Sequence, residues 1–213
     1  MSKYILIDLE DTITIHKDKE RVKSVMIRWL KNNGIKDAEN IYNNPNFKNR
    51  ESRLKLLKIT KKEYEKWYEN FKEAEFEEYY ENFKLGEIKI EKSAIDFIKK
   101  NKNILILVSN SAPKWIDFIL EKYGIKKYFK YIFYREYKIN DVKKPSKEVI
   151  KIIENDINDN IDNFSIVIGD SYTDYLFAKI CNLKFVCMYN KIENCNIYKD
   201  FNEVDELIKE NIE

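Results

Sequence analysis

The sequence predicts a protein of the α/β class: a three-layer core with a mainly parallel sheet between helices, plus one all-helical insertion. Three observations predict this class. Short blocks of apolar, strand-forming residues recur along the chain, helical stretches separate them, and polar or acidic residues follow them directly. In residues 17–87 the apolar side chains follow helical spacing instead.

The predicted strands are four short apolar blocks. They cover residues 4–7, 104–108, 164–168 and 185–188. Because helical stretches separate them, the sheet is expected to be mainly parallel. The predicted core is therefore discontinuous in sequence and takes residues 1–16 and 88–213.

Helix signals follow the second block. Pro113 opens a segment with one apolar stripe, and Gly124 is expected to end it. Ser146 is expected to cap the next helix, and Asn202 is expected to cap the last one.

Residues 17–87 are expected to form helices, because three apolar stripes there have helical spacing. The stripes are Val22, Met26, Trp29 and Leu30; Tyr64, Trp67, Tyr68 and Phe71; and Phe76, Tyr79, Tyr80 and Phe83. The second and third stripes are out of phase, which predicts a bend near residues 72–75. The Asn-rich stretch from Ile35 to Arg53 is expected to be a loop.

Composition excludes several functions. The 213 residues include 39 basic and 37 acidic side chains, and the net charge of +2 creates no field that would attract nucleic acid or a membrane. The four glycines lie too far apart to form a dinucleotide-binding glycine motif or a P-loop. The single histidine excludes a zinc site that needs a pair of histidines. Three cysteines without paired spacing, short apolar runs and no signal peptide together predict a cytoplasmic protein.

Acidic, hydroxyl and amide side chains come just after three of the predicted strands. They are Asp8, Glu10, Ser109, Asn110, Asp170 and Asp174. Ligands of an open parallel sheet bind at the carboxyl ends of its strands, so these side chains are expected to meet there, with Lys144 in reach from a loop. Clustered carboxylates repel one another unless a cation is present, and Mg²⁺ beside Lys144 would satisfy this requirement.

Four motifs in this order resemble the haloacid dehalogenase (HAD) superfamily of phosphatases over nearly the whole chain. They are Asp8-Leu9-Glu10-Asp11-Thr12, Ser109-Asn110, Lys144-Pro145 and Gly169-Asp170-Ser171-Tyr172-Thr173-Asp174. The resemblance implies a Rossmann-like parallel-sheet core. It also implies that residues 17–87 are an α-helical cap of the first type, as in phosphoglycolate-phosphatase-like members. Such caps exclude water and select the substrate.

The resemblance also implies a role for each site residue. Asp8 would be the nucleophile, and Glu10 would protonate the leaving alcohol and then activate water. Mg²⁺ would be held by Asp8, Asp170 and the backbone carbonyl of Glu10, while Asp174 would orient metal-bound water or Lys144. The phosphoryl group would be bound by Ser109, Asn110 and Lys144.

Two positions depart from the motifs, and three further residues are considered as possible substrate contacts. Glu10 stands where the family commonly has Asp, and Asp11 stands where it commonly has Gly. His16 is expected to be an exposed linker residue. Arg50 and Arg53 are expected to be surface residues, with binding of a substrate carboxylate or second phosphate as the alternative.

The predicted function is Mg²⁺-dependent hydrolysis of a small phosphorylated metabolite, a phosphomonoester, through an aspartyl-phosphate on Asp8. No nucleic acid and no membrane are expected as partners. Two alternatives stay open: a non-catalytic protein that binds a phosphorylated ligand, suggested by Glu10 and Asp11, and a 2-haloacid dehalogenase, disfavoured by the Gly169-Asp170 element. The substrate's identity and the oligomeric state are not determined by the sequence.

Overall fold

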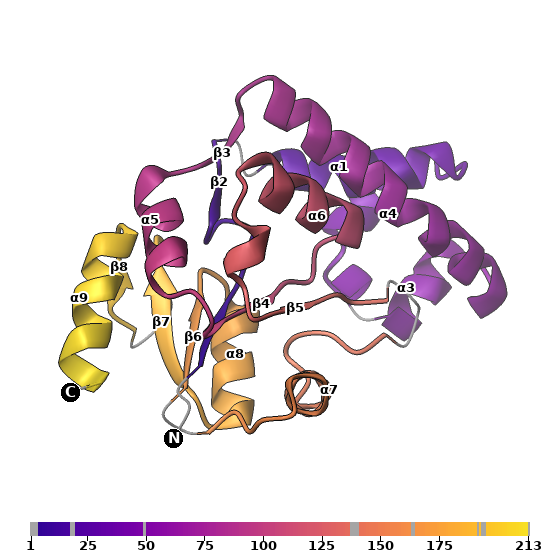
Figure 1. Cartoon of the computed structure of the whole chain (residues 1–213). Helices are drawn as coiled ribbons and strands as arrows, with labels where there is room; N and C mark the ends of the chain where they lie inside the picture. The colour runs from indigo at the N-terminus through magenta and orange to yellow at the C-terminus, as the bar shows by residue number, and fades with distance from the viewer. Residues whose placement is uncertain are drawn as a thin grey trace. The chain divides into compact units, whose positions relative to one another are not determined.

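The computed structural model describes residues 4–17, 20–48, 50–136, 141–162, 165–190, 192 and 195–212 (Figure 1). The chain divides into two compact units. One unit spans Met1–His16, Ile88–Arg135 and Val142–Glu213, and the other spans Lys17–Glu87 and Glu136–Asp141. We call them the core unit and the helical unit.

The core unit is built on a six-stranded parallel sheet with the strand order β5-β4-β1-β6-β7-β8. The strands are β1 (Ile5–Ile7), β4 (Leu105–Val108), β5 (Tyr131–Phe133), β6 (Ile166–Gly169), β7 (Lys184–Met188) and β8 (Ile197–Tyr198). The prediction of a parallel α/β core is confirmed. Four of these strands overlap the predicted blocks, although Phe164 lies outside the described residues.

Sequence patterns missed the remaining strands. β5 and β8 are the two edge strands of the sheet, and both are very short. A separate antiparallel pair joins β2 (Thr14–His16) to β3 (Ile88–Ile90), with His16 opposite Ile88. Two or three residues are too few to show a period, and β2, β3 and β8 lack the continuous apolar run that predicted the equally short β1.

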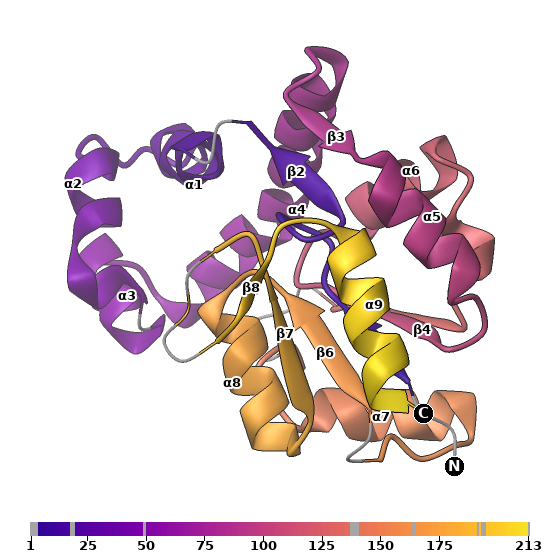
Figure 2. The same cartoon turned by 90° about the vertical axis from the view of Figure 1, so that its left-hand side faces the viewer.

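Helices cover both faces of the sheet (Figures 1 and 2). α5 (Lys92–Lys100) and α9 (Phe201–Ile212) pack together on one face, while α7 (Glu148–Ile157) and α8 (Tyr172–Cys181) lie on the other. α6 (Pro113–Lys122) follows β4, and a 3₁₀ turn covers Lys126–Tyr128. These layers form the three-layer core that the sequence predicts.

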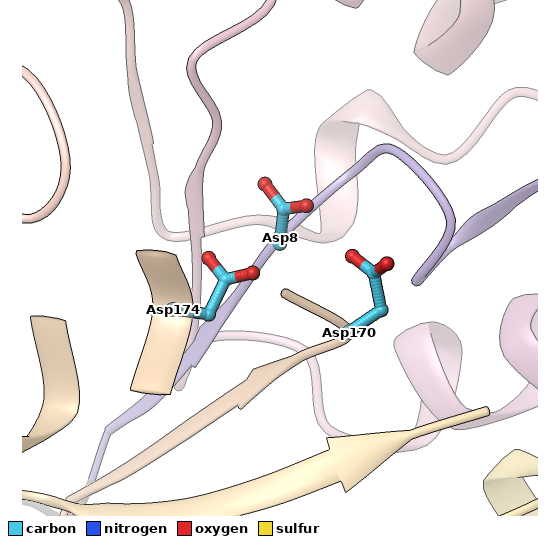
Figure 3. A group of neighbouring side chains, drawn as sticks. All are labelled: Asp8, Asp170 and Asp174. Atoms are coloured by element: carbon cyan, nitrogen blue, oxygen red, sulfur yellow. The ribbon is translucent and has the colours of Figure 1, made fainter. Parts of the chain in front are cut away.

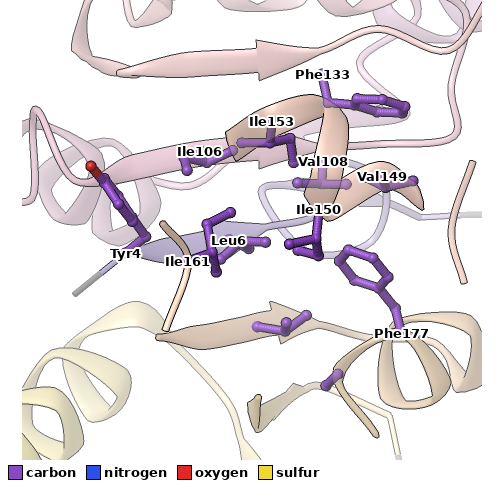
Figure 4. Packing of buried hydrophobic residues seen from close by; sticks show 12 residues of the cluster. Tyr4, Leu6, Ile106, Val108, Phe133, Val149, Ile150, Ile153, Ile161 and Phe177 are labelled. Carbon is purple, nitrogen blue, oxygen red and sulfur yellow. The ribbon is translucent and has the colours of Figure 1, made fainter. Parts of the chain in front are cut away.

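A cluster of buried hydrophobic side chains explains how the sheet and the helices hold together. Side chains that alternate along the central strands, among them Leu6, Ile106 and Val167, face Val149 of α7 and Phe177 of α8 (Figure 4). Their neighbours in sequence point to the opposite face and are also buried. Strands that are buried on both faces read as continuous apolar runs, which is why they could be predicted.

Two helix starts differ from their predictions. α7 begins at Glu148 with Lys147 at the N-cap position, one residue after the predicted cap Ser146. Ser146 Oγ still accepts from the backbone N–H of Glu148 over 3.2 Å. The last helix is capped by Asp200 and not by Asn202, because Asp200 Oδ1 accepts from the backbone N–H groups of Asn202 and Glu203. A cap precedes the N–H groups that it binds, so Asn202 is already too far along the helix.

The helical unit contains α1 (Glu20–Asn32), α2 (Ala38–Asn43), a 3₁₀ turn (Pro45–Lys48), α3 (Arg50–Leu57) and α4 (Lys61–Lys84). Trp29 of α1 packs edge-on against Tyr64, Trp67 and Phe71 of α4, so these members of the predicted stripes form an aromatic core. The side chain of Val22 lies outside the described part of the chain.

Two predictions for the helical unit are wrong. The stretch from Ile35 to Arg53 contains α2, a 3₁₀ turn and the start of α3 instead of a loop, although Asn44 makes a turn by accepting from the N–H of Asn46. The bend near residues 72–75 is absent because α4 runs unbroken through them. That helix contains no Gly or Pro that would break it, and it begins with a capping box at Thr60. Because the helix is continuous, its two out-of-phase stripes lie on different faces of one helix.

In the described part of the chain, every helix is too short or too polar to span a bilayer.

Candidate active site

Three acidic side chains meet at the carboxyl ends of β1 and β6 (Figure 3). Asp8 follows β1, Asp170 follows β6, and Asp174 lies in the first turn of α8. Each offers a carboxylate oxygen within 4.8 Å of the others. The parallel pairing of β1 with β6 brings them together, because both strands end at the same edge and Asp8 N–H donates to the carbonyl of Ile168.

Lys144 joins two of these acids. Its Nζ lies 2.6 Å from Asp8 Oδ1 and 2.5 Å from Asp174 Oδ1, and the side chain is 4% exposed. Burial opposes its charge, but attraction to Asp174 and Asp8 outweighs burial and raises the pKa of Lys144 to about 12. Lys143 is exposed, so the buried lysine of the site is Lys144.

The acid cluster carries an excess of negative charge. Burial raises the pKa of Asp8 well above its usual value, Lys144 opposes this rise, and Asp174 and Asp170 add to it. A divalent cation with oxygen ligands would relieve this repulsion, and closely spaced carboxylate oxygens are the donors that Mg²⁺ prefers. The residues present therefore fit a magnesium site.

Asp174 has both of its carboxylate oxygens bound by the protein. Oδ1 accepts from Lys144, and Oδ2 accepts from the backbone N–H and the hydroxyl of Ser171, which completes the capping box of α8. Its place depends on Gly169, since a Cβ at this position would lie 2.5 Å from Cβ and Cγ of Asp174. Asp174 is therefore arranged to hold Lys144.

Asp170 is held by a residue that sequence reasoning missed. Asn190 Nδ2 donates to Asp170 Oδ2 over 2.7 Å and to the Asp170 carbonyl over 3.1 Å. Thr12 Oγ1 lies 3.4 Å from Asp170 Oδ1. Asn190 follows β7, the neighbour of β6 in the sheet, so the rule that gathers strand-end residues at one edge could have identified it.

Ser109 and Asn110 follow β4, the strand that pairs with β1 on the side away from β6. Ser109 is buried, and its Oγ accepts from the N–H of Ser111. The Asn110 side chain binds the backbone of Lys144 twice: Nδ2 donates to the Lys144 carbonyl, and Oδ1 accepts from the Lys144 N–H, both over 3.1 Å. Asn110 thus positions Lys144 through its side chain, in addition to the phosphoryl contact that the sequence predicts for it.

The carboxylate of Glu10 has a separate set of partners. His16 and Thr14 contact Oε2, while Ser111 and Trp115 contact Oε1. Burial raises the pKa of Glu10, but the hydrogen bonds from His16, Ser111 and Trp115 outweigh it and lower the pKa. Burial lowers the pKa of His16, and its contact with Glu10 outweighs this and raises it.

The prediction of an exposed His16 is wrong, because the residue is 7% exposed. It stands in β2, opposite Ile88, and its ring points to Glu10. A histidine before a charged stretch shows no sign in the sequence of the strand that buries it. Trp115 reads as a core residue in the sequence and is fully buried, but its indole N–H also reaches Glu10.

Asp11 has a conformational reason for standing where relatives commonly have glycine. Its φ of 53° lies in the left-handed region, which glycine adopts without strain and aspartate tolerates better than most residues. Its side chain also contributes, since Oδ1 accepts from the backbone N–H of His16 over 3.2 Å.

Two arginines of the helical unit, Arg50 and Arg53, are the ones for which the sequence offers binding of a substrate anion as the alternative. Arg53 donates from Nε to the Phe47 carbonyl and from Nη1 to the Tyr64 hydroxyl, and its guanidinium lies over the Phe47 ring. These contacts give Arg53 a packing role within this unit. Arg50 begins α3, and its side chain lies outside the described part of the chain.

The three-layer core with acids at the carboxyl ends of its strands defines the Rossmann-like α/β class that the sequence predicts. Residues 3–182 match the family model of haloacid dehalogenase-like hydrolases. The chain therefore belongs to this family and is a HAD-like hydrolase.

Solved structures agree with this fold. A HAD hydrolase of family IA, variant 3, from Entamoeba histolytica has a TM-score of 0.69 and 18% identity, covering 99% of this chain and 100% of its own. A candidate phosphatase from Clostridium difficile has a TM-score of 0.60 and 21% identity, covering 98% and 100%. The candidate HAD-hydrolase YfnB from Bacillus subtilis, bound to magnesium, has a TM-score of 0.58 and 17% identity, covering 97% and 98%. No match to the chain was found among curated proteins.

Proposed function

We propose that this protein hydrolyses a small phosphomonoester with Mg²⁺ through an aspartyl-phosphate on Asp8. The observation that carries the proposal is the buried group in which Lys144 Nζ bridges Asp8 and Asp174 beside Asp170. Such a group places a nucleophile, a fixed positive charge and oxygen ligands at one point of the sheet edge.

Each step of the reaction uses residues of this group and Glu10. An oxygen of Asp8 attacks phosphorus while the bond to the leaving oxygen breaks. The negative charge of the bound phosphate opposes the hydrogen bonds that lower the pKa of Glu10 in the free protein, so Glu10 takes up a proton and gives it to that oxygen. Glu10, now a carboxylate, then takes a proton from water, and the resulting hydroxide attacks phosphorus and releases phosphate from Asp8. Ser109 and the backbone amide of Asn110 bind the phosphoryl oxygens, and Lys144 offsets their charge.

Magnesium would be held by Asp8, Asp170 and the backbone carbonyl of Glu10. When bound, it supplies positive charge that screens the phosphoryl oxygens from the attacking carboxylate. Asp174 acts through Lys144, because both of its oxygens already accept hydrogen bonds from Lys144 and Ser171. The magnesium in the YfnB structure supports this choice of ion.

The helical unit is proposed to be the cap of the enzyme. Residues 17–87 are inserted between β2 and β3, and they form helices around an aromatic core of their own. A cap of this kind excludes water from the reacting phosphate and selects the substrate. The proposed substrate is a small phosphorylated metabolite.

The first test is turnover of a chromogenic aryl phosphate by the purified protein. We expect activity with Mg²⁺, loss of activity with a chelator, and a fall of at least about 100-fold in Asp8→Asn because the nucleophile is lost. Asp96→Asn is the matched control, since Asp96 is an exposed residue of α5. Acid quenching during turnover should leave one phosphoryl group on Asp8, detected by mass spectrometry of the digested protein. Equal activity in Asp8→Asn would refute the proposal.

The same assay separates the two alternatives. Halide release from a 2-haloacid without metal would identify a dehalogenase. Tight binding of a phosphorylated ligand, with no hydrolysis across a panel of phosphometabolites, would identify a non-catalytic binding protein.

A further inference from the structure

The carboxylate of Glu10 lies among four side-chain partners. His16 Nε2 lies 2.6 Å from Oε2, and Thr14 Oγ1 lies 3.1 Å from the same oxygen. Ser111 Oγ lies 2.9 Å from Oε1, and Trp115 Nε1 lies 2.6 Å from it. A carboxylate accepts about four hydrogen bonds, so three committed donors would fix the group and still leave one acceptor position for proton transfer.

The partners are unequal. An indole N–H donates only, so the contact with Trp115 has one possible direction. His16 is assigned as the donor because it faces a carboxylate. Thr14 has a single hydroxyl hydrogen, and its Oγ1 also lies 3.0 Å from the Leu9 carbonyl, so its contact with Glu10 is the least secure of the four. We therefore call His16, Ser111 and Trp115 the Glu10 cradle.

The cradle is rigidly mounted. Trp115 is fully buried in α6, while His16 and Ser111 are 7% and 6% exposed. His16 is held in β2 by its pairing with β3, and its N–H donates to Asp11 Oδ1. The Ser111 N–H donates to Ser109 Oγ, so the cradle is also linked to the predicted phosphate-binding residues. Three buried polar groups from two distant segments thus converge on one carboxylate.

We propose that His16, Ser111 and Trp115 are positioning residues that hold Glu10 where it transfers protons, an inference that rests on the proposed function. A glutamate has more rotamers than an aspartate, and a general acid acts only within hydrogen-bond reach of the leaving oxygen. The cradle holds the longer glutamate side chain in one conformation. The same contacts explain why the chain buries its one histidine here.

Positioning of a general acid has a consequence that depends on the substrate. A leaving group that is a weak base departs without a proton, whereas an alkoxide must be protonated as it leaves. Loss of the cradle should therefore slow the hydrolysis of alkyl phosphates much more than that of activated aryl phosphates. A residue that merely stabilises the fold would slow both equally.

The test measures kcat/KM for a series of phosphomonoesters, from dinitrophenyl phosphate through phenyl phosphate to an alkyl phosphate. This ratio reports the steps up to phosphoryl transfer to Asp8. In His16→Ala and Trp115→Phe we expect a fall of about 10- to 100-fold for the alkyl ester, which is part of the usual contribution of general acid catalysis. For dinitrophenyl phosphate we expect values within about threefold of the unmodified protein.

Two further variants connect the effect to Glu10. His16→Gln keeps a side-chain N–H donor and should recover most of the alkyl-ester activity. In a Glu10→Gln background, His16→Ala should have little added effect, because the group that it positions has already lost its function. Trp29→Phe is the matched control, since it removes a buried indole N–H that binds the Trp67 carbonyl in the helical unit.

The outcomes separate this inference from the proposed function. If the unmodified protein hydrolyses none of the esters, or if Asp8→Asn hydrolyses them equally well, the proposed function fails. If the unmodified protein is active but the cradle variants lose activity equally across the series, the inference is overturned. An additive loss in the Glu10→Gln background also overturns it. Ser111→Ala, the smallest change, provides the same test if a larger substitution prevents folding.

Discussion

At Gly169 the missing side chain matters for packing and not for backbone freedom. A Cβ there would lie 2.5 Å from two atoms of Asp174, a residue that is 1% exposed and held by Lys144 and Ser171. Asp174 could make room only by giving up these partners. The glycine of this motif therefore sets the position of Lys144 through Asp174.

We expect Gly169→Ala to lower the free energy of unfolding by about 1–3 kcal/mol, as overpacking does, and to reduce aryl phosphate turnover strongly. Urea unfolding and the same chromogenic assay measure the two effects. Gly124→Ala is the control: it places a side chain at a φ of 65° with no atom within 4 Å, so it should cost about 1 kcal/mol and leave turnover intact. Full turnover in Gly169→Ala would contradict the argument.

The motif residues themselves were predicted from the sequence, while two of their partners were missed. Asp8, Asp170 and Lys144 were predicted to meet because strand ends of a parallel sheet share one edge. Asn190 was missed although it follows the predicted block at residues 185–188 and the same rule applies to it. His16 was missed because the short strand that buries it has no local signature.

Among the elements, the loop before α7 is tied to the end of β4. The side chain of Asn110 makes two hydrogen bonds to the backbone of Lys144, which lies 34 positions later in the chain. This clamp fixes the loop independently of the ion pairs that Lys144 makes at its other end. A short polar side chain thus connects two elements that the sheet alone does not join.

We expect Asn110→Ala to destabilise the protein by roughly 1–3 kcal/mol, since two hydrogen bonds are lost. Turnover should also fall, because the ammonium of Lys144 is no longer held in one place. Thermal unfolding and the aryl phosphate assay measure these effects. Asn101→Ala removes one side-chain bond to the Phe97 carbonyl at the end of α5 and should leave turnover unchanged. An Asn110→Ala protein with normal kinetics would show that the clamp is dispensable.

Some elements follow directly from sequence and others do not. The central strands and α6 were predicted because continuous apolar runs and the Pro113–Gly124 boundaries are local signals. The bend in α4 was predicted wrongly, because an apolar stripe can shift to another face while the helix runs on unbroken. Which face of a helix is covered depends on what packs against it.

For the whole molecule, the insertion point of the helical unit suggests that the core unit folds by itself. His16 and Ile88 are register partners in the antiparallel pair of β2 and β3, so a two-residue turn can join them. The six-stranded sheet and the buried cluster around Leu6 and Phe177 lie entirely in the core unit.

We expect a chain in which Asn-Gly replaces residues 17–87 to fold cooperatively and to gain thermal stability with Mg²⁺, because a ligand that binds only the folded state stabilises it. Circular dichroism melts with Mg²⁺ and with chelator measure this. Asp170→Asn in the same shortened chain should abolish most of the metal-dependent shift. An unfolded shortened chain, or a shift that survives Asp170→Asn, would contradict the prediction.

The sequence by itself determined the α/β class, the parallel sheet, the HAD resemblance and the residues that form the acid cluster. These depend on local periodicity and on the rule that parallel strands end at one edge. Only the tertiary structure decided that Gly169 leaves room for Asp174, that Asn110 clamps Lys144, and that His16 and Trp115 reach Glu10. Such contacts join residues from separate segments, and their geometry exists only after the strands have paired and the helices have packed.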